Sequence, residues 1–280
     1  MENQIMNYAH FFKLSYDYLL DKAKNHGVDK NNLNKYFVPN SSKNTIKGLP
    51  KQKSLKRIFC RLCFHAQNGT MVSGVINYNK NFEALKKITY GFDPNKVLSK
   101  YNNSDDIFKK LCASIRHNPS HTEKMEIYSR TIYSGAEFVA SFQSYQDFIN
   151  KLSSYDEFAP VFVMYNVIGM KTLAYDFLKE LDDGFDVCKP DVHLTECMKI
   201  LMNVPDYSDS NTLNYHVSKA CKCLANNISA AINKKITTYM LDKMLFLICS
   251  ETFYSDDNVP NRGDKTAKRD RYLKYIMDNI

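Results

Sequence analysis

The scarcity of chain-breaking residues limits what this chain can fold into. It contains only 9 glycines and 8 prolines among its 280 residues, which is about half of their ordinary usage. Apolar residues recur at helical spacing, as in the segment 11–19. No segment keeps the alternation of apolar and polar residues that is typical of a strand. The sequence therefore predicts an all-α protein built from long helices.

The helical pattern is interrupted by polar segments and by segments that contain glycine or proline. Residues 27–54 are rich in Asn and Lys and include Pro39, Gly48 and Pro50, which predicts a connection without regular structure. The length of the chain allows one large domain or two lobes. The main helices are expected at 5–26, 55–67, 81–90, 104–116, 122–141, 144–153, 192–202, 211–231 and 235–250.

Composition gives weaker guidance about partners and compartment. The formal net charge of +8 suits an anionic partner, nucleic acid first and a membrane surface second. No secretory signal is visible at the N-terminus, and no apolar run reaches the length of a membrane span. The eight cysteines are therefore expected as reduced thiols in a cytoplasmic protein without a membrane segment.

Two short motifs carry most of the functional information. Gly169-Met170-Lys171-Thr172 lies between two apolar segments, so a tight turn is expected at Gly169 and Lys171 is expected to open the following helix. Pro190-Asp191-Val192-His193 follows, with Asp191 20 residues after Lys171. An Asp after a proline is most often a helix cap, and a lysine at a helix start is most often solvated. The conjunction of the two motifs at this spacing favours a functional role.

The stretch Tyr165–Ala174 resembles the second half of a helix–hairpin–helix motif, and the wider pattern resembles the helix–hairpin–helix (HhH-GPD) DNA glycosylase superfamily. Members carry a Leu-Pro-Gly-Val-Gly-x-Lys-Thr-Ala-like hairpin and, about twenty residues later, a Val-Asp-x-His-like segment. The match is closest to lysine-containing members, such as 8-oxoguanine glycosylase and endonuclease III. The iron–sulfur ligand set of some members is absent, because Cys221 and Cys223 alone cannot hold a cluster.

The resemblance implies a two-lobed helical fold. One lobe is expected to combine residues 1–70 with 192–280, and a central lobe is expected over 71–191 with the hairpin at about 154–181. The hairpin of the family presents backbone N–H groups to a DNA phosphate without reading sequence. The implied partner is double-stranded DNA with a damaged or modified base, bound by a monomer that requires no metal or organic cofactor.

The implied activity is that of a DNA repair enzyme, a bifunctional DNA glycosylase and AP lyase that removes a base, with oxidised bases favoured. Lys171 would attack the anomeric carbon as a neutral amine, helped by a helix start and by partial burial, both of which lower a lysine pKa. Asp191 would stabilise charge on the sugar or activate the nucleophile. The residues implied in DNA binding are Gln67 or Asn68 as the filler of the gap left by the extruded base, the hairpin residues Val167, Gly169, Met170 and Thr172, and also His193, Tyr128 and Arg130.

Two alternatives stay open at this point. The usual Pro-Gly of the hairpin is Asn166-Val167 here, and a β-branched residue does not readily adopt a positive φ. This departure favours a non-catalytic DNA-binding module that keeps the hairpin only for phosphate contact. The other alternative is a glycosylase that acts on foreign or modified DNA. A zinc half-site at Cys60, Cys63 and His65 is disfavoured against buried thiols, because no second Cys/His pair is evident.

Overall fold

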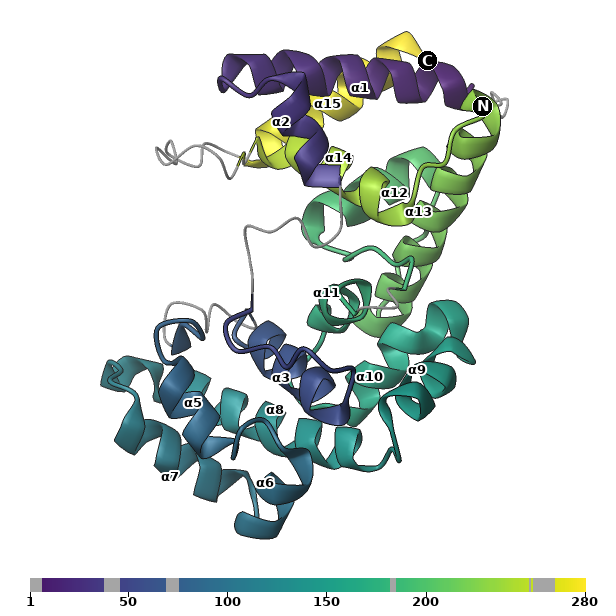
Figure 1. Cartoon of the computed structure of the whole chain (residues 1–280). Helices are drawn as coiled ribbons and strands as arrows, with labels where there is room; N and C mark the ends of the chain where they lie inside the picture. Colours follow the sequence, from purple (N-terminus) through teal and green to yellow (C-terminus); the bar gives the residue numbers. More distant parts are fainter. Residues whose placement is uncertain (1–6, 38–45, 69–75, 182–184, 252, 254–264) are drawn as a thin grey trace. The chain divides into compact units, whose positions relative to one another are not determined.

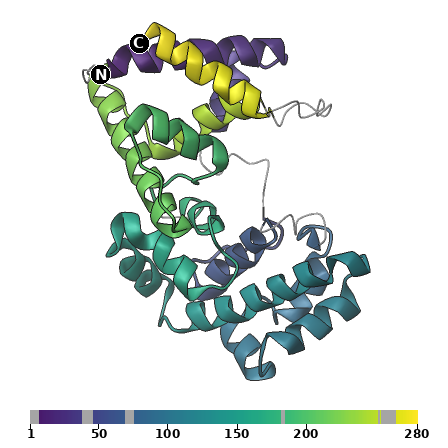
Figure 2. The same cartoon turned by 180° about the vertical axis from the view of Figure 1, so that it is seen from behind.

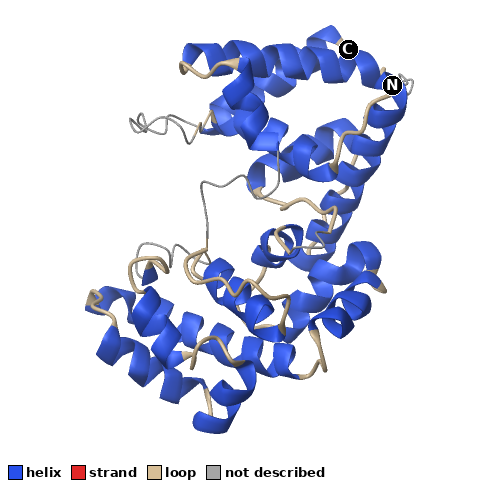
Figure 3. Cartoon of the chain, in the orientation of Figure 1, coloured by secondary structure: helices blue, strands red, loops and turns tan. Residues whose placement is uncertain are grey.

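The computed structural model describes residues 7–37, 46–68, 76–181, 185–251, 253 and 265–280. Within these residues every regular element is a helix and no strand occurs (Figure 3), so the all-α prediction is confirmed for the part of the chain that is described. The chain divides into two compact units, one formed by residues 1–43 and 186–280 and the other by residues 44–185.

The 44–185 unit is organised around its longest helix, α8. This helix contacts α3, α6 and α7, and Tyr128 on α8 donates a hydrogen bond of 2.9 Å from its hydroxyl to the carbonyl of Cys63 on α3. The helices of this unit are α3 (Leu55–Ala66), α5 (Phe82–Ile88), α6 (Pro94–Lys100), α7 (Ser104–Ser114), η4 (Pro119–His121), α8 (Thr122–Ala140), α9 (Tyr145–Ser153), η5 (Asp156–Phe158), α10 (Ala159–Asn166) and α11 (Leu173–Lys179) (Figure 1).

The other unit joins the two ends of the chain. The first helix, α1, contacts the last helix, α15, and the two lie side by side in both views (Figures 1 and 2). Between them and α12, α13 and α14 lies a continuous apolar core. The helices of this unit are α1 (Tyr8–Asn25), α2 (Lys30–Asn34), η1 (Lys35–Phe37), α12 (Val192–Met202), α13 (Ser210–Ile232), α14 (Thr238–Ser250) and α15 (Lys265–Asn279).

A charge cluster holds three helices of this unit together. Glu251 follows α14 and lies 2.9 Å from the amine of Lys268 on α15 and 3.6 Å from that of Lys22 on α1. His26, which follows α1, lies 3.7 Å from the same carboxylate. Burial alone would raise the pKa of Glu251. The neighbouring Lys268 and Lys22 lower it by more than burial raises it, so the pKa lies below its usual value. The cluster therefore stabilises this unit when the carboxylate is charged.

The unit boundaries differ from those expected from the sequence. The expected boundaries were 70 and 191, whereas the chain divides at 43/44 and at 185/186. The first difference arises because α3 packs on α8 and α11, so it belongs with the central unit. The second arises because Asp186 accepts a hydrogen bond from the N–H of Thr238 on α14, at 2.9 Å, which ties the segment before Asp191 to the other unit.

Candidate functional site

The segment predicted to form the hairpin consists of two short helices joined by a turn. Helix α10 ends at Asn166 and α11 begins at Leu173. Gly169 in the turn has a φ of +84°, and a Cβ built on it would lie 2.6 Å from the Thr131 side-chain oxygen on α8. Only glycine combines this backbone conformation with so close an approach. The glycine of the motif thus sets the hairpin directly against α8.

Two residues of the turn anchor it to the core. Val167 and Met170 are both fully buried, and the Met170 N–H donates to the Val167 carbonyl at 3.3 Å. Fully buried side chains have no surface to offer to DNA, so a contact of these two residues with DNA would have to come from their backbone; that contact stays a prediction. Val167 has an extended backbone with a φ of −124°, so the β-branched residue occupies a position that does not need glycine.

The backbone of the turn leaves several donors without a recorded hydrogen bond. Ile168 donates its N–H to the side-chain oxygen of Ser134 on α8, at 3.0 Å. Among the interactions recorded for the described residues, the N–H groups of Gly169, Lys171 and Thr172 have no acceptor. Thr172 is half-buried and its side chain does not cap α11. Free N–H groups in a turn before a helix are the kind of donor that holds a phosphate oxygen.

Lys171 is exposed and has an unusual backbone conformation. Its φ is +42°, in the left-handed region that residues other than Gly, Asn and Asp seldom adopt. The expected partial burial of this side chain is wrong, because Lys171 is exposed. No hydrogen bond or ion pair of its amine is recorded among the described residues. The lysine therefore presents an accessible amine from a turn whose neighbours Met170 and Leu173 are buried.

Asp191 is the N-cap of α12, in the other unit. One of its oxygens, Oδ1, accepts hydrogen bonds from the N–H groups of His193 and Leu194, both at 2.9 Å. Its second oxygen, Oδ2, has no bond recorded in the described part of the chain. The cap thus fixes the orientation of the carboxylate and leaves one oxygen available. Pro190 and Leu194 on either side are buried.

Three other side chains predicted to contact DNA point into the core, so they have little surface to offer to it. The Gln67 side-chain oxygen accepts the Tyr78 N–H at 2.7 Å, so it holds the chain after α3 and does not fill a gap in DNA. Tyr128 is 1% exposed and bonded to α3. His193 is 5% exposed and its ring faces that of Phe246.

Asn68 and Arg130 remain exposed. Asn68 immediately precedes residues outside the described part of the chain, and its own N–H donates to the His65 carbonyl at 2.9 Å. The Arg130 guanidinium forms an ion pair with Glu126 one turn earlier on α8. Such a surface pair is weak, so the guanidinium can exchange its partner for a phosphate. The role of both residues in DNA binding stays a prediction.

The structure adds one contact behind the hairpin that the sequence did not reveal. His65 on α3 lies 3.0 Å, through Nε2, from a carboxylate oxygen of Glu180, the residue that follows α11. No spacing rule links residues so far apart in the sequence. Cys60 and Cys63, which share a helix with His65, are buried thiols as expected. Among the described residues no group of His, Cys, Asp or Glu is arranged to hold a metal ion.

In the part of the chain that the structure covers, no helix has both the length and the apolar character needed to cross a membrane. Comparisons of the chain with models of known protein families, with curated proteins and with solved structures each gave no match. The functional assignment of the hairpin and of Asp191 therefore depends on their residues and geometry.

Proposed function

We propose that the chain is a DNA glycosylase with AP-lyase activity that removes a damaged base, with oxidised bases favoured, through Lys171 and Asp191. The observation that carries the proposal is the placement of Lys171. A lysine at a φ of +42° costs about 1 kcal/mol relative to an unstrained conformation. Seven other non-glycine residues among those described also have a positive φ, and what distinguishes Lys171 is the exposed nucleophile that it bears next to unpaired N–H donors.

The chemistry follows from these groups. The neutral Lys171 amine attacks C1′ of the deoxyribose, the C1′–N bond breaks, and the base leaves with the bonding electrons and takes up a proton. Opening of the sugar ring gives a protonated Schiff base between Lys171 and C1′. Loss of a C2′ proton then expels the 3′ phosphate by β-elimination, which nicks the strand. Water finally hydrolyses the Schiff base and returns the free lysine.

Asp191 is assigned the carboxylate role in this reaction. By the resemblance, its carboxylate stabilises the positive charge that develops on the sugar as the base departs, or activates the nucleophile. The two N–H groups on Oδ1 hold the carboxylate in one orientation, as a preorganised catalytic group requires. The base itself must leave the duplex stack to be reached.

Sodium borohydride trapping tests the proposal, because hydride reduces the Schiff base to a stable amine that links protein to DNA. The substrates are duplexes that carry an abasic site, 8-oxoguanine or thymine glycol. Wild type is expected to form a covalent adduct with the abasic site and with one of the two lesions. Lys171→Gln is expected to form none. The matched control is Lys110→Gln, which removes an exposed lysine from α7 in the same unit.

Borohydride trapping also distinguishes the proposed enzyme from the main alternative. A non-catalytic helix–hairpin–helix module is favoured by one observation, namely that phosphate binding needs only the free N–H groups of Gly169, Lys171 and Thr172. Such a module binds duplex DNA but gives no adduct with any of the three substrates. An adduct that persists in Lys171→Gln would instead assign the nucleophile to another amine and would refute the proposed role of Lys171.

A further inference from the structure

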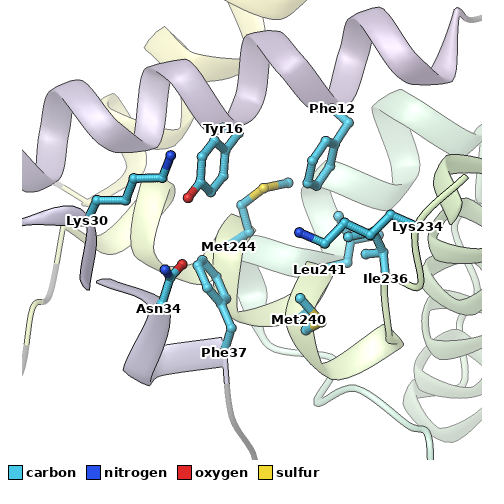
Figure 4. Close-up of a pocket in the computed structure, with 10 residues that line it drawn as sticks. All are labelled: Phe12, Tyr16, Lys30, Asn34, Phe37, Lys234, Ile236, Met240, Leu241 and Met244. Carbon is cyan, nitrogen blue, oxygen red and sulfur yellow. The ribbon is translucent and has the colours of Figure 1, made fainter. Parts of the chain in front are cut away.

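A cavity lies within the unit formed by residues 1–43 and 186–280, and no residue of the two motifs lines it. Its volume is about 250 Å³. Helices α1, α2, η1 and α14, together with the turn before α14, surround it (Figure 4). The residues that line it are Phe12, Tyr16, Lys30, Asn34, Phe37, Lys234, Ile236, Met240, Leu241 and Met244.

The walls of the cavity are aromatic, and flexible methionine side chains form part of the rest of its lining. Phe12 and Tyr16 are one turn apart on α1, with ring centroids 6.0 Å apart and an interplanar angle of 15°, so their rings are nearly parallel. Phe37 of η1 faces them across the hollow (Figure 4). Met240 and Met244 come from α14. Flat aromatic faces with adaptable methionines favour a planar ring as the occupant.

The charged residues that line the cavity are both lysines. Lys30 and Lys234 reach it from opposite sides (Figure 4), and no ion pair is recorded for either amine among the described residues. No acidic residue is among those that line the cavity. Unpaired cations beside an apolar hollow raise the local concentration of anions. The cavity is therefore matched to a negatively charged ligand.

Tyr16 adds a hydrogen-bonding group. Its hydroxyl has no recorded partner among the described residues, and it lies on the Lys30 side of the hollow (Figure 4). Burial raises the pKa of Tyr16, so the hydroxyl stays protonated near neutral pH and can donate to an anionic oxygen. The amide of Asn34 lies next to it on the cavity wall. Two neutral polar groups thus accompany the two ammonium groups.

The segment that carries Lys234 is held in place by its neighbours. The Ile236 N–H donates to the side-chain oxygen of Ser229 on α13, at 2.8 Å, and the Lys234 N–H donates to the Ser229 carbonyl at 3.2 Å. Thr237 then caps α14 by accepting the Met240 N–H at 3.1 Å. The backbone positions of Lys234, Ile236 and Met240 are therefore fixed, as a preformed ligand site requires.

We propose that this cavity binds a small molecule that joins a planar ring to an anionic group, with the ring between the α1 aromatics and Phe37 and the anion at Lys30 or Lys234. The volume lies just below the range of about 300–1,000 Å³ that is typical of sites for drug-sized ligands. It therefore suits a single ring system and not a long cofactor. This site is independent of the proposed reaction at Lys171.

Methionine-methyl NMR tests this proposal on the full chain. The chain has 11 methionines, and the methyl signals of Met240 and Met244 are assigned from single Met→Leu variants. The probes are adenosine 5′-monophosphate and indole-3-acetate, which combine a ring with a phosphate or a carboxylate. Adenosine supplies a ring alone, and inorganic phosphate and decanoate supply an anion without a ring. At least one ring-bearing anion is expected to shift both methyl signals saturably.

Substitutions locate the anion. Lys30→Gln or Lys234→Gln is expected to weaken binding of the ring-bearing anion roughly fivefold or more, since the lost contact is charge-assisted. Lys235→Gln, an exposed lysine next to Lys234 that does not line the cavity, is expected to leave it unchanged. Preference for the phosphate or the carboxylate probe identifies the anionic group. Shifts confined to other methionines, or equal binding of adenosine or decanoate, would overturn the proposal.

Discussion

Gly169 packs so closely against Thr131 that a single added carbon would collide with it. A Cβ on Gly169 would lie 2.6 Å from the Thr131 hydroxyl oxygen, and the glycine φ is +84°. Gly169→Ala is therefore expected to lower the free energy of unfolding by about 2–4 kcal/mol, from the left-handed backbone and from overpacking. Urea denaturation followed by circular dichroism measures the loss.

Gly91 provides the matched control. Its φ is +75°, but a Cβ there would meet nothing within 4 Å, so Gly91→Ala is expected to lose only the backbone part, about 1 kcal/mol. The double variant Gly169→Ala with Thr131→Ala removes the obstacle and is expected to recover part of the loss. Equal losses for Gly169→Ala and Gly91→Ala would show that the close approach to α8 does not matter.

Local signals were sufficient to predict most of the helices. The scarcity of Gly and Pro excluded a many-turned fold, and the turn at Gly169 followed from the residue itself. Asp191 after Pro190 was recognisable as a helix start, and it is the cap of α12. The helix expected at 122–141 is α8, Thr122–Ala140. These features are encoded within a few residues of each other, so they can be read without knowledge of the rest of the chain.

Whether an individual side chain points into the core or to the surface could not be predicted in the same way. Tyr128 points inward because α8 packs on α3, and Gln67, which follows α3, points inward because it accepts the Tyr78 N–H. Val167 was expected at the DNA surface, but it is fully buried because the turn folds it into the core. The cavity combines residues from the first and last thirds of the chain, and no spacing rule connects those.

Lys171 is expected to make the protein less stable than a glycine at the same position would. Because its φ is +42° and its side chain is exposed, Lys171→Gly relieves the backbone and is expected to raise the free energy of unfolding by up to about 1 kcal/mol. The same variant is expected to lose all borohydride-trapped adduct. This opposition between stability and activity is the pattern of a strained catalytic residue.

Lys110→Gly is the control for the Lys171 prediction. Lys110 is exposed within α7, where glycine costs about 1 kcal/mol relative to ordinary residues. The two lysine-to-glycine changes are therefore expected to shift the urea midpoint in opposite directions. A Lys171→Gly variant that is destabilised as much as Lys110→Gly would argue against strain at Lys171.

The contact between His65 and Glu180 predicts a dependence of stability on pH. Burial alone would raise the pKa of the Glu180 carboxyl. His65 beside it lowers that pKa by more than burial raises it, so the pKa lies below the usual 4.5. A carboxyl whose pKa is lowered on folding stabilises the protein above its unfolded pKa, and this contribution is lost as the pH falls through the folded pKa. The stabilisation is therefore expected above pH 4.5 and is lost below it.

Thermal unfolding at a series of pH values checks this sign. Wild type is expected to unfold at a higher temperature than Glu180→Gln above pH 4.5, and the two midpoints are expected to converge at lower pH. Glu137→Gln on α8 removes an exposed carboxylate of the same unit and serves as the control. A gap between wild type and Glu180→Gln that stays constant down to pH 3 would contradict the role given to this contact.

Asp191 has a structural role as a cap and a proposed role in catalysis, and two substitutions separate them. Asn caps a helix about as well as Asp, whereas Ala at an N-cap costs about 0.5–2 kcal/mol. Asp191→Asn is therefore expected to keep the unfolding free energy within a few tenths of a kcal/mol, while Asp191→Ala loses about 1 kcal/mol. Both are expected to slow base release by roughly 10²-fold or more, since both remove the carboxylate.

Asp209 is also an N-cap, of a different helix, and no catalytic role is proposed for it. It caps α13 in the same unit by accepting the Thr212 N–H at 2.7 Å. Asp209→Asn and Asp209→Ala are expected to repeat the stability pattern of the Asp191 pair and to leave base release unchanged. If Asp191→Asn released the base as fast as wild type, the carboxylate would be a cap alone. The reaction proposed at Lys171 would then have to proceed without this carboxylate.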